Sequence, residues 1–81
     1  MLYDVAVLLP EEMTEELVGV LQDSFSFACP SVGRTYDNRP GTEVYLTYEA
    51  HDLVHALRVA VEGLDGISAI ESVSIDIVAP R

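Results

Sequence analysis

Apolar residues along the chain fall into segments whose spacing alternates between that of strands and that of helices. The first segment, Leu2–Leu9, is almost wholly apolar, and only Asp4 interrupts it before Pro10 ends it. Its length and its Val and Leu content predict a strand that is buried on at least one face. The bulkier, uncharged face is expected to pack against helices. It consists of Tyr3, Val5, Val7 and Leu9.

Two longer segments repeat their apolar residues every three or four positions, which is the spacing of one face of a helix. The first helix is expected to begin at Pro10 or Thr14 and to end near Phe27. The second is expected to begin within 49–52 and to stop at Gly63 and Gly66. The stripe of the first consists of Met13, Leu17, Val20, Leu21, Ser24, Phe25 and Ala28. The stripe of the second consists of Leu53, Ala56, Leu57, Ala60, Val61 and Leu64.

Three further segments alternate with a period of two and predict strands. Residues 32–37 are short and polar, as suits an edge strand, with Val32, Arg34 and Tyr36 on one face. The turn-forming residues 37–41 separate them from a stronger strand at 42–48, so the two read as a hairpin. The last strand lies within 67–78. There Val73, Ile75 and Ile77 alternate with Ser72, Ser74 and Asp76.

The resulting order of elements is β-α-β-β-α-β. Two right-handed crossovers joined by a hairpin give an α+β fold of the ferredoxin-like type, a four-stranded antiparallel sheet with two helices on one face. We expect residues 1–81 to form a single domain. The first and third strands are central in this topology, and they are also the most apolar strands of the sequence.

The charge is strongly acidic. Asp and Glu number 14 against 4 Arg, Lys is absent, and the formal net charge is -10. Such a chain repels phosphate backbones, so we expect no direct nucleic-acid binding, in spite of tyrosines on the predicted sheet. Three explanations of the acidity stay open: solubility in an acidic proteome, docking to a basic partner, and mimicry of nucleic acid.

Size and composition exclude other classes. No apolar run approaches the ~20 residues that a membrane span needs. No basic segment precedes the first apolar stretch, which argues against a signal peptide. A single cysteine forms no internal disulfide. We therefore expect a cytoplasmic protein with no membrane partner.

Three groups of residues are candidates for chemical sites. Cys29 and Arg34 are separated by four residues, one fewer than in the phosphate loop of cysteine phosphatases, and a strand rather than a helix follows them. His51 and His55 have a spacing that can clamp a metal, but no third ligand is spaced to join them. The carboxylates of 11–16 suit the start of a helix. We expect no catalytic residue, cofactor or metal, and no enzyme.

The sheet face without helices is the expected interaction surface. Its predicted residues are Asp4, Ala6, Leu8, Arg34, Tyr36, Tyr45, Thr47, Ser72, Ser74 and Asp76. The leading hypothesis is a small acidic interaction module that contacts a protein partner, or forms a homodimer, through this face. The alternatives are an acidic inhibitor that mimics nucleic acid, of the phage type, and a small-molecule-sensing domain at a dimer seam. The topology alone does not choose among them.

Overall fold

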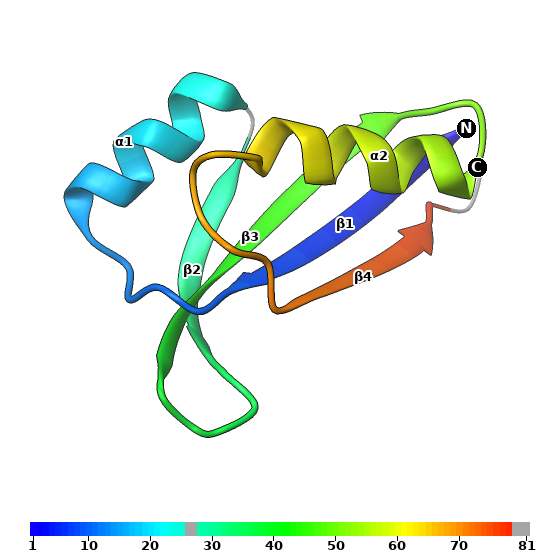
Figure 1. Ribbon diagram of the computed structural model, residues 1–81. Coiled ribbons are helices and arrows are strands. Elements are labelled where there is room, and N and C mark those ends of the chain that lie inside the picture. Colours follow the sequence, from blue (N-terminus) through cyan, green and yellow to red (C-terminus); the bar gives the residue numbers. More distant parts are fainter. Residues whose placement is uncertain (26–27, 79–81) are drawn as a thin grey trace.

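The computed structural model describes residues 1–25 and 28–78, and this part of the chain contains one sheet and two helices (Figure 1). The elements in chain order are β1 (Leu2–Leu9), α1 (Glu15–Ser24), β2 (Cys29–Arg34), β3 (Pro40–Glu49), α2 (Leu53–Leu64) and β4 (Ser72–Ile77). The strands lie in the order β2-β3-β1-β4, and every neighbouring pair is antiparallel. Both helices lie on the same side of the sheet (Figure 1). The predicted ferredoxin-like arrangement is therefore confirmed.

The core lies between the central strands and the two helices. Val7 and Leu9 are fully buried, and Tyr3 and Val5 are at most 3% exposed, which confirms the predicted orientation of β1. In the antiparallel register, Val7 lies opposite the buried Val44 of β3, so the inward faces of the two central strands coincide. Full burial of a Val or Leu side chain stabilises the folded state by about 1.5–3 kcal/mol. The buried residues of β1 and β3 therefore contribute much of the hydrophobic stabilisation of the fold.

Helix α1 is shorter at its N-terminus than the earliest predicted start. It begins at Glu15, after Thr14 as N-cap, whose hydroxyl accepts the backbone N–H of Leu17 at 3.1 Å. This cap satisfies one of the N–H groups that lack a partner within the helix. The stretch from Pro10 to Thr14 is therefore a connection rather than helix, although Thr14 was one of the two expected starting points.

The buried side of α1 is narrower than the predicted stripe. Leu17, Leu21 and Phe25 are buried, but Val20 is 40% exposed and Ser24 is exposed, so those two assignments were wrong. The helix ends at Ser24, and Phe25 has an extended backbone. The expected end at Phe27 lies outside the described residues.

Helix α2 begins after Asp52, whose carboxylate accepts the His55 N–H at 2.8 Å as an N-cap. Residues 49–51, expected to open this helix, belong instead to the end of β3 and the connection that follows it. Gly63 does not stop the helix but lies within its last turn, while Gly66 follows the helix with a left-handed φ of 80°. The Tyr48 hydroxyl donates to the Ala56 carbonyl and so links β3 to the first turn of α2.

Helix α2 packs against the rest of the fold through two alanines, a glycine and its last leucine. Ala56, Ala60 and Leu64 are fully buried. A Cβ added to Gly63 would lie 1.9 Å from Cζ of Phe25, so the aromatic ring rests directly on this glycine. Three residues assigned to the buried stripe are instead substantially exposed, and that part of the prediction was wrong. They are Leu53, Leu57 and Val61.

The β2–β3 hairpin extends past the helices (Figure 1). Strand β2 begins at Cys29 and ends at Arg34, so it starts earlier than predicted. In the connecting turn, Thr35 donates to the Asp37 carboxylate, which also forms an ion pair with Arg39 at 2.7 Å. The hydrogen bond from Thr35 and the Arg39 charge hold the pKa of Asp37 below its ordinary value. Asn38 takes the left-handed conformation that such turns favour.

Within residues 1–25 and 28–78, no helix has the length and apolar character needed to cross a membrane.

Candidate functional site on the open sheet face

The open sheet face is the side of the sheet that neither helix covers. The register places Asp4 of β1 between Thr47 of β3 and Asp76 of β4, and Ala6 between Tyr45 and Ser74. Leu8 lies between Glu43 and Ser72 in the same way. The structure therefore brings together eight residues that the sequence assigned to this face. They are Asp4, Ala6, Leu8, Tyr45, Thr47, Ser72, Ser74 and Asp76.

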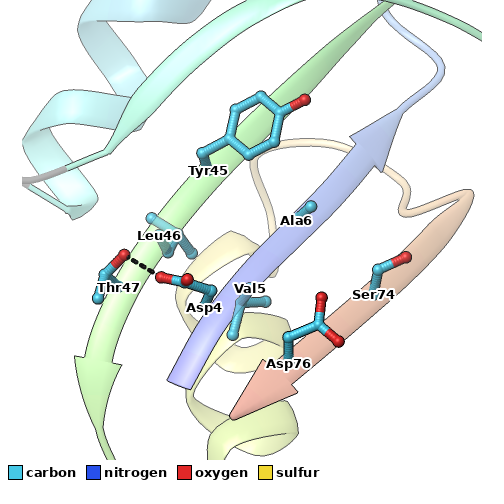
Figure 2. Close-up of a pocket in the computed structure, with 8 residues that line it drawn as sticks. All are labelled: Asp4, Val5, Ala6, Tyr45, Leu46, Thr47, Ser74 and Asp76. Carbon is cyan, nitrogen blue, oxygen red and sulfur yellow. Dashed lines mark hydrogen bonds between the residues drawn. The ribbon is translucent and has the colours of Figure 1, made fainter. Parts of the chain in front are cut away.

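A shallow depression occupies the middle of this face (Figure 2). Ala6 forms its floor because it is the smallest side chain in its row, and the larger Tyr45 stands beside it on β3. Tyr45 is 46% exposed, so its ring offers apolar surface that the fold does not cover. Asp4 and Asp76 border the depression at the end of β1 where the chain begins.

A neutral hydroxyl donates a hydrogen bond to the acidic border. The Thr47 hydroxyl donates to Oδ1 of Asp4 at 2.6 Å, which is drawn as the dashed line in Figure 2. Asp76 lies directly opposite Asp4 in the antiparallel register, so two carboxylates of like charge are neighbours. Like charges directly opposite each other disfavour strand pairing, so these carboxylates do not strengthen the contact between β1 and β4.

Glu43 extends this acidic character along β3. Its carboxylate accepts the Tyr45 hydroxyl at 2.9 Å, and this hydrogen bond raises the pKa of Tyr45 above its ordinary value. Because Glu43 engages the hydroxyl, it orients the exposed ring over the face. In this arrangement Tyr45 presents an apolar ring with its polar end already occupied.

Two predicted members of the face are placed elsewhere. Arg34 pairs with Pro40 in the register that puts Val32 opposite the buried Thr42, so its side chain belongs to the helix side of the sheet. Its guanidinium donates to the Asn38 carbonyl in the hairpin turn at 3.2 Å. Tyr36 lies in the turn after the last residue of β2 and is 82% exposed. The error arose because a shift of one residue in register exchanges the two faces of a strand.

Sequence reasoning missed further residues of the open face, among them Cys29, Ser31 and Glu43. The register places Cys29 opposite Tyr45, Ser31 opposite Glu43, and Glu43 itself beside Leu8. Glu43 was available from its alternation with the inward Val44. Cys29 and Ser31 could not be assigned, since the start of β2 was placed after them. A Cβ added to Gly33 would lie 3.3 Å from Cδ1 of Leu8, so β2 leaves room for that side chain.

The histidine pair that was considered as a metal clamp lies at the start of α2. His51 precedes α2 rather than belonging to it, and the His51 N–H donates to Nδ1 of His55 at 3.1 Å. The two rings stack with centroids 5.1 Å apart. Among the described residues, no group of three or more His, Cys, Asp or Glu side chains is arranged to hold a metal ion. The expectations of no metal, no cofactor and no catalysis stay predictions.

Comparison with known proteins supplies no family for this chain. No protein-family model matches the sequence, and no curated protein matches it.

Proposed function

We propose that the protein is a small, non-catalytic interaction module whose open sheet face binds a basic segment of a protein partner. The observation that carries the proposal is the exposed Tyr45 ring beside the Ala6 depression, with the carboxylates of Asp4 and Asp76 on the border. An aromatic anchor beside an apolar hollow is typical of the centre of a protein interface. The surrounding carboxylates match a partner that brings Lys or Arg.

The distribution of cations supports a basic partner rather than a second copy at this face. Arg34 and Arg39 are engaged in the hairpin turn, and Arg58 lies on α2. By register, the described part of the open face carries Asp4, Asp76, Glu43 and Glu49 and no Arg. Two open faces brought together would oppose carboxylates without cations, which costs several kcal/mol.

Site-specific crosslinking tests the proposal. A photo-reactive phenylalanine replaces Tyr45 in one variant and Val20, on α1, in a matched control, since the two side chains are exposed to a similar extent. We expect a covalent adduct with one dominant basic protein from position 45, which weakens when Asp4→Asn and Asp76→Asn are added. The proposal fails if position 45 gives no adduct, gives the same adducts as position 20, or crosslinks only to a second copy.

The nucleic-acid-mimic hypothesis is a special case of binding to a basic partner, and a separate experimental result distinguishes it. Glu11, Glu12, Glu15 and Glu16 are all exposed around the start of α1, so carboxylates are also exposed away from the open face. A mimic requires the captured protein to be one that binds nucleic acid, and it requires a nucleic-acid oligomer to compete for the adduct. Capture of a basic protein that nucleic acid does not displace supports the plain interaction module instead.

A further inference from the structure

Strand β4 ends the strand order, so one of its backbone edges has no neighbouring strand in the described part of the chain. The Val78 N–H donates to the Leu2 carbonyl at 2.9 Å, which fixes the direction of the alternating backbone groups. These groups alternate in direction along an antiparallel strand. The backbone N–H and C=O groups of the even-numbered residues of β4 therefore point toward β1. Val73, Ile75 and Ile77 therefore direct their N–H and C=O groups toward the open edge.

The same three residues carry apolar side chains on the helix side of the sheet, next to exposed apolar residues of α2. A groove between the two elements is lined by Leu53, Val54, Leu57, Val73 and Ile75. Ile77 is 55% exposed at the end of β4, and Val61 is exposed one turn after Leu57. We call this surface the α2–β4 strip; it consists of Leu53, Val54, Leu57, Val61, Val73, Ile75 and Ile77.

The strip exists because α2 is apolar over more of its circumference than it buries. At 100° per residue, its apolar positions span roughly 220°, about twice the width of an ordinary core-facing stripe. The helix buries the Ala56–Ala60–Gly63 side, so the larger Leu53, Leu57 and Val61 project past the edge of the sheet. Exposed apolar residues beside an open strand edge form a surface that natural proteins normally cover.

The distribution of charge indicates which partner covers the α2–β4 strip. None of the seven strip residues is ionisable, whereas the chain as a whole has a formal charge of -10. A second copy can therefore approach through the strip without opposing its own carboxylates, which the open sheet face does not allow. Arg58 and Glu62 follow the strip on the α2 circumference, so a twofold partner brings one cation and one anion to the border.

We infer that two copies of this chain pair antiparallel through β4 across a twofold axis at Ile75. In this register the outward N–H and C=O groups of Val73, Ile75 and Ile77 all pair with the second copy. Val73 lies opposite Ile77 of the second copy. Ser74 then lies opposite Asp76 of the second copy on the open side, which places a hydroxyl donor against each carboxylate. The register centred on Asp76 places two carboxylates together instead. The exposed side chains of α2 meet their counterparts above the joined strands.

Sedimentation equilibrium tests this inference with matched variants. The wild-type chain is expected to associate to twice its 8.9 kDa mass. Leu57→Glu on α2 should weaken the association at least about tenfold, which corresponds to about 1.4 kcal/mol. Val20→Glu on α1 introduces the same charge at a site with the same 40% exposure and should leave it unchanged. If Leu57→Glu unfolds the chain by circular dichroism, Val61→Glu replaces it.

A second variant tests the strand pairing separately from the side chains. Ile77→Pro removes an N–H that points away from β1, so the fold tolerates it as an edge proline while the association weakens. Tyr45→Ala should leave the association unchanged, which separates this inference from the proposed function of the open face. A wild-type chain that stays at 8.9 kDa at millimolar concentration overturns the inference, as does equal weakening by Leu57→Glu and Val20→Glu.

Discussion

The open sheet face and the α2–β4 strip are both exposed, but their chemistry is opposite. The open face is built on central strands whose backbones are fully paired, and carboxylates border its depression. The strip combines uncharged apolar side chains with the backbone edge of β4, which has no neighbouring strand among residues 1–25 and 28–78. We propose that the open face excludes a second copy of this acidic chain and that the strip admits one. Surfaces of such different chemistry let a small domain keep two contacts distinct.

The difference originates in how α2 sits on the sheet. Small residues beneath the helix allow a close approach, with the Phe25 ring over Gly63, and this orientation turns Leu57 outward. A chain of this length buries only about 60–65% of its unfolded surface, so the exposed strip is a substantial part of what the monomer leaves uncovered.

The largest expected effect on stability comes from disturbing the packing of α2 against Phe25. Gly63→Ala should destabilise the fold by about 2–3 kcal/mol, because the added Cβ overlaps the Phe25 ring. Gly19→Ala in α1 should stabilise it by up to about 1 kcal/mol, since nothing lies within 4 Å of the added Cβ. Urea unfolding of both variants at low protein concentration measures the difference. Equal effects at the two glycines would contradict the described docking of α2.

Salt should act with opposite signs on the two surfaces. Raising NaCl from about 0.05 M to about 0.5 M screens the net repulsion between two acidic copies, so self-association through the strip should tighten. The same change should weaken binding of a basic partner at the open face, where attraction between opposite charges contributes. Parallel titrations by sedimentation and by calorimetry measure the two slopes. If self-association and partner binding changed in the same direction with salt concentration, the proposed electrostatic distinction between the two surfaces would be contradicted.

A smaller effect is expected within the acidic border. Asp76→Asn should stabilise the monomer by about 0.5 kcal/mol at low salt, because it removes the like charge opposite Asp4. Glu12→Gln, in the connection before α1, gives the baseline for removing one charge from the chain. The gain should disappear at high salt. Destabilisation by Asp76→Asn would show that the carboxylate has a structural partner.

The smallest expected effects are spectroscopic and separate two tyrosines on opposite sides of β3. Burial raises the pKa of Tyr48, whereas the hydrogen bond to Glu43 raises the pKa of Tyr45. Glu43→Gln should return the Tyr45 pKa toward its ordinary value and leave Tyr48 unchanged, as followed by NMR of the two rings. Because the folded-state pKa of Tyr48 lies above its unfolded value, its contribution to stability is complete below about pH 10 and declines above it. Tyr48→Phe should flatten that decline.

The sequence predicted the elements whose periodicity is unambiguous. The alternation of β1 and β3 determined both the central strands and most of the open face, since Val5 and Val44 leave no choice of side. Strand β2 was predicted less well, because its polar residues do not specify a register and Arg34 was assigned to the wrong side. The strip was missed because the apolar stripe of α2 was interpreted as core, although it is wider than an ordinary core-facing stripe. That width could have indicated an exposed apolar surface on the helix.

The most direct test of the two-surface account is an amide NMR concentration series on the wild-type chain. The account predicts that shifts and slowed exchange grow with concentration at Val73, Ile75 and Ile77 and along the exposed side of α2. Amides of Ala6, Tyr45 and Thr47 on the open face should stay unchanged. Concentration-dependent shifts confined to the open face, with β4 unaffected, would contradict it.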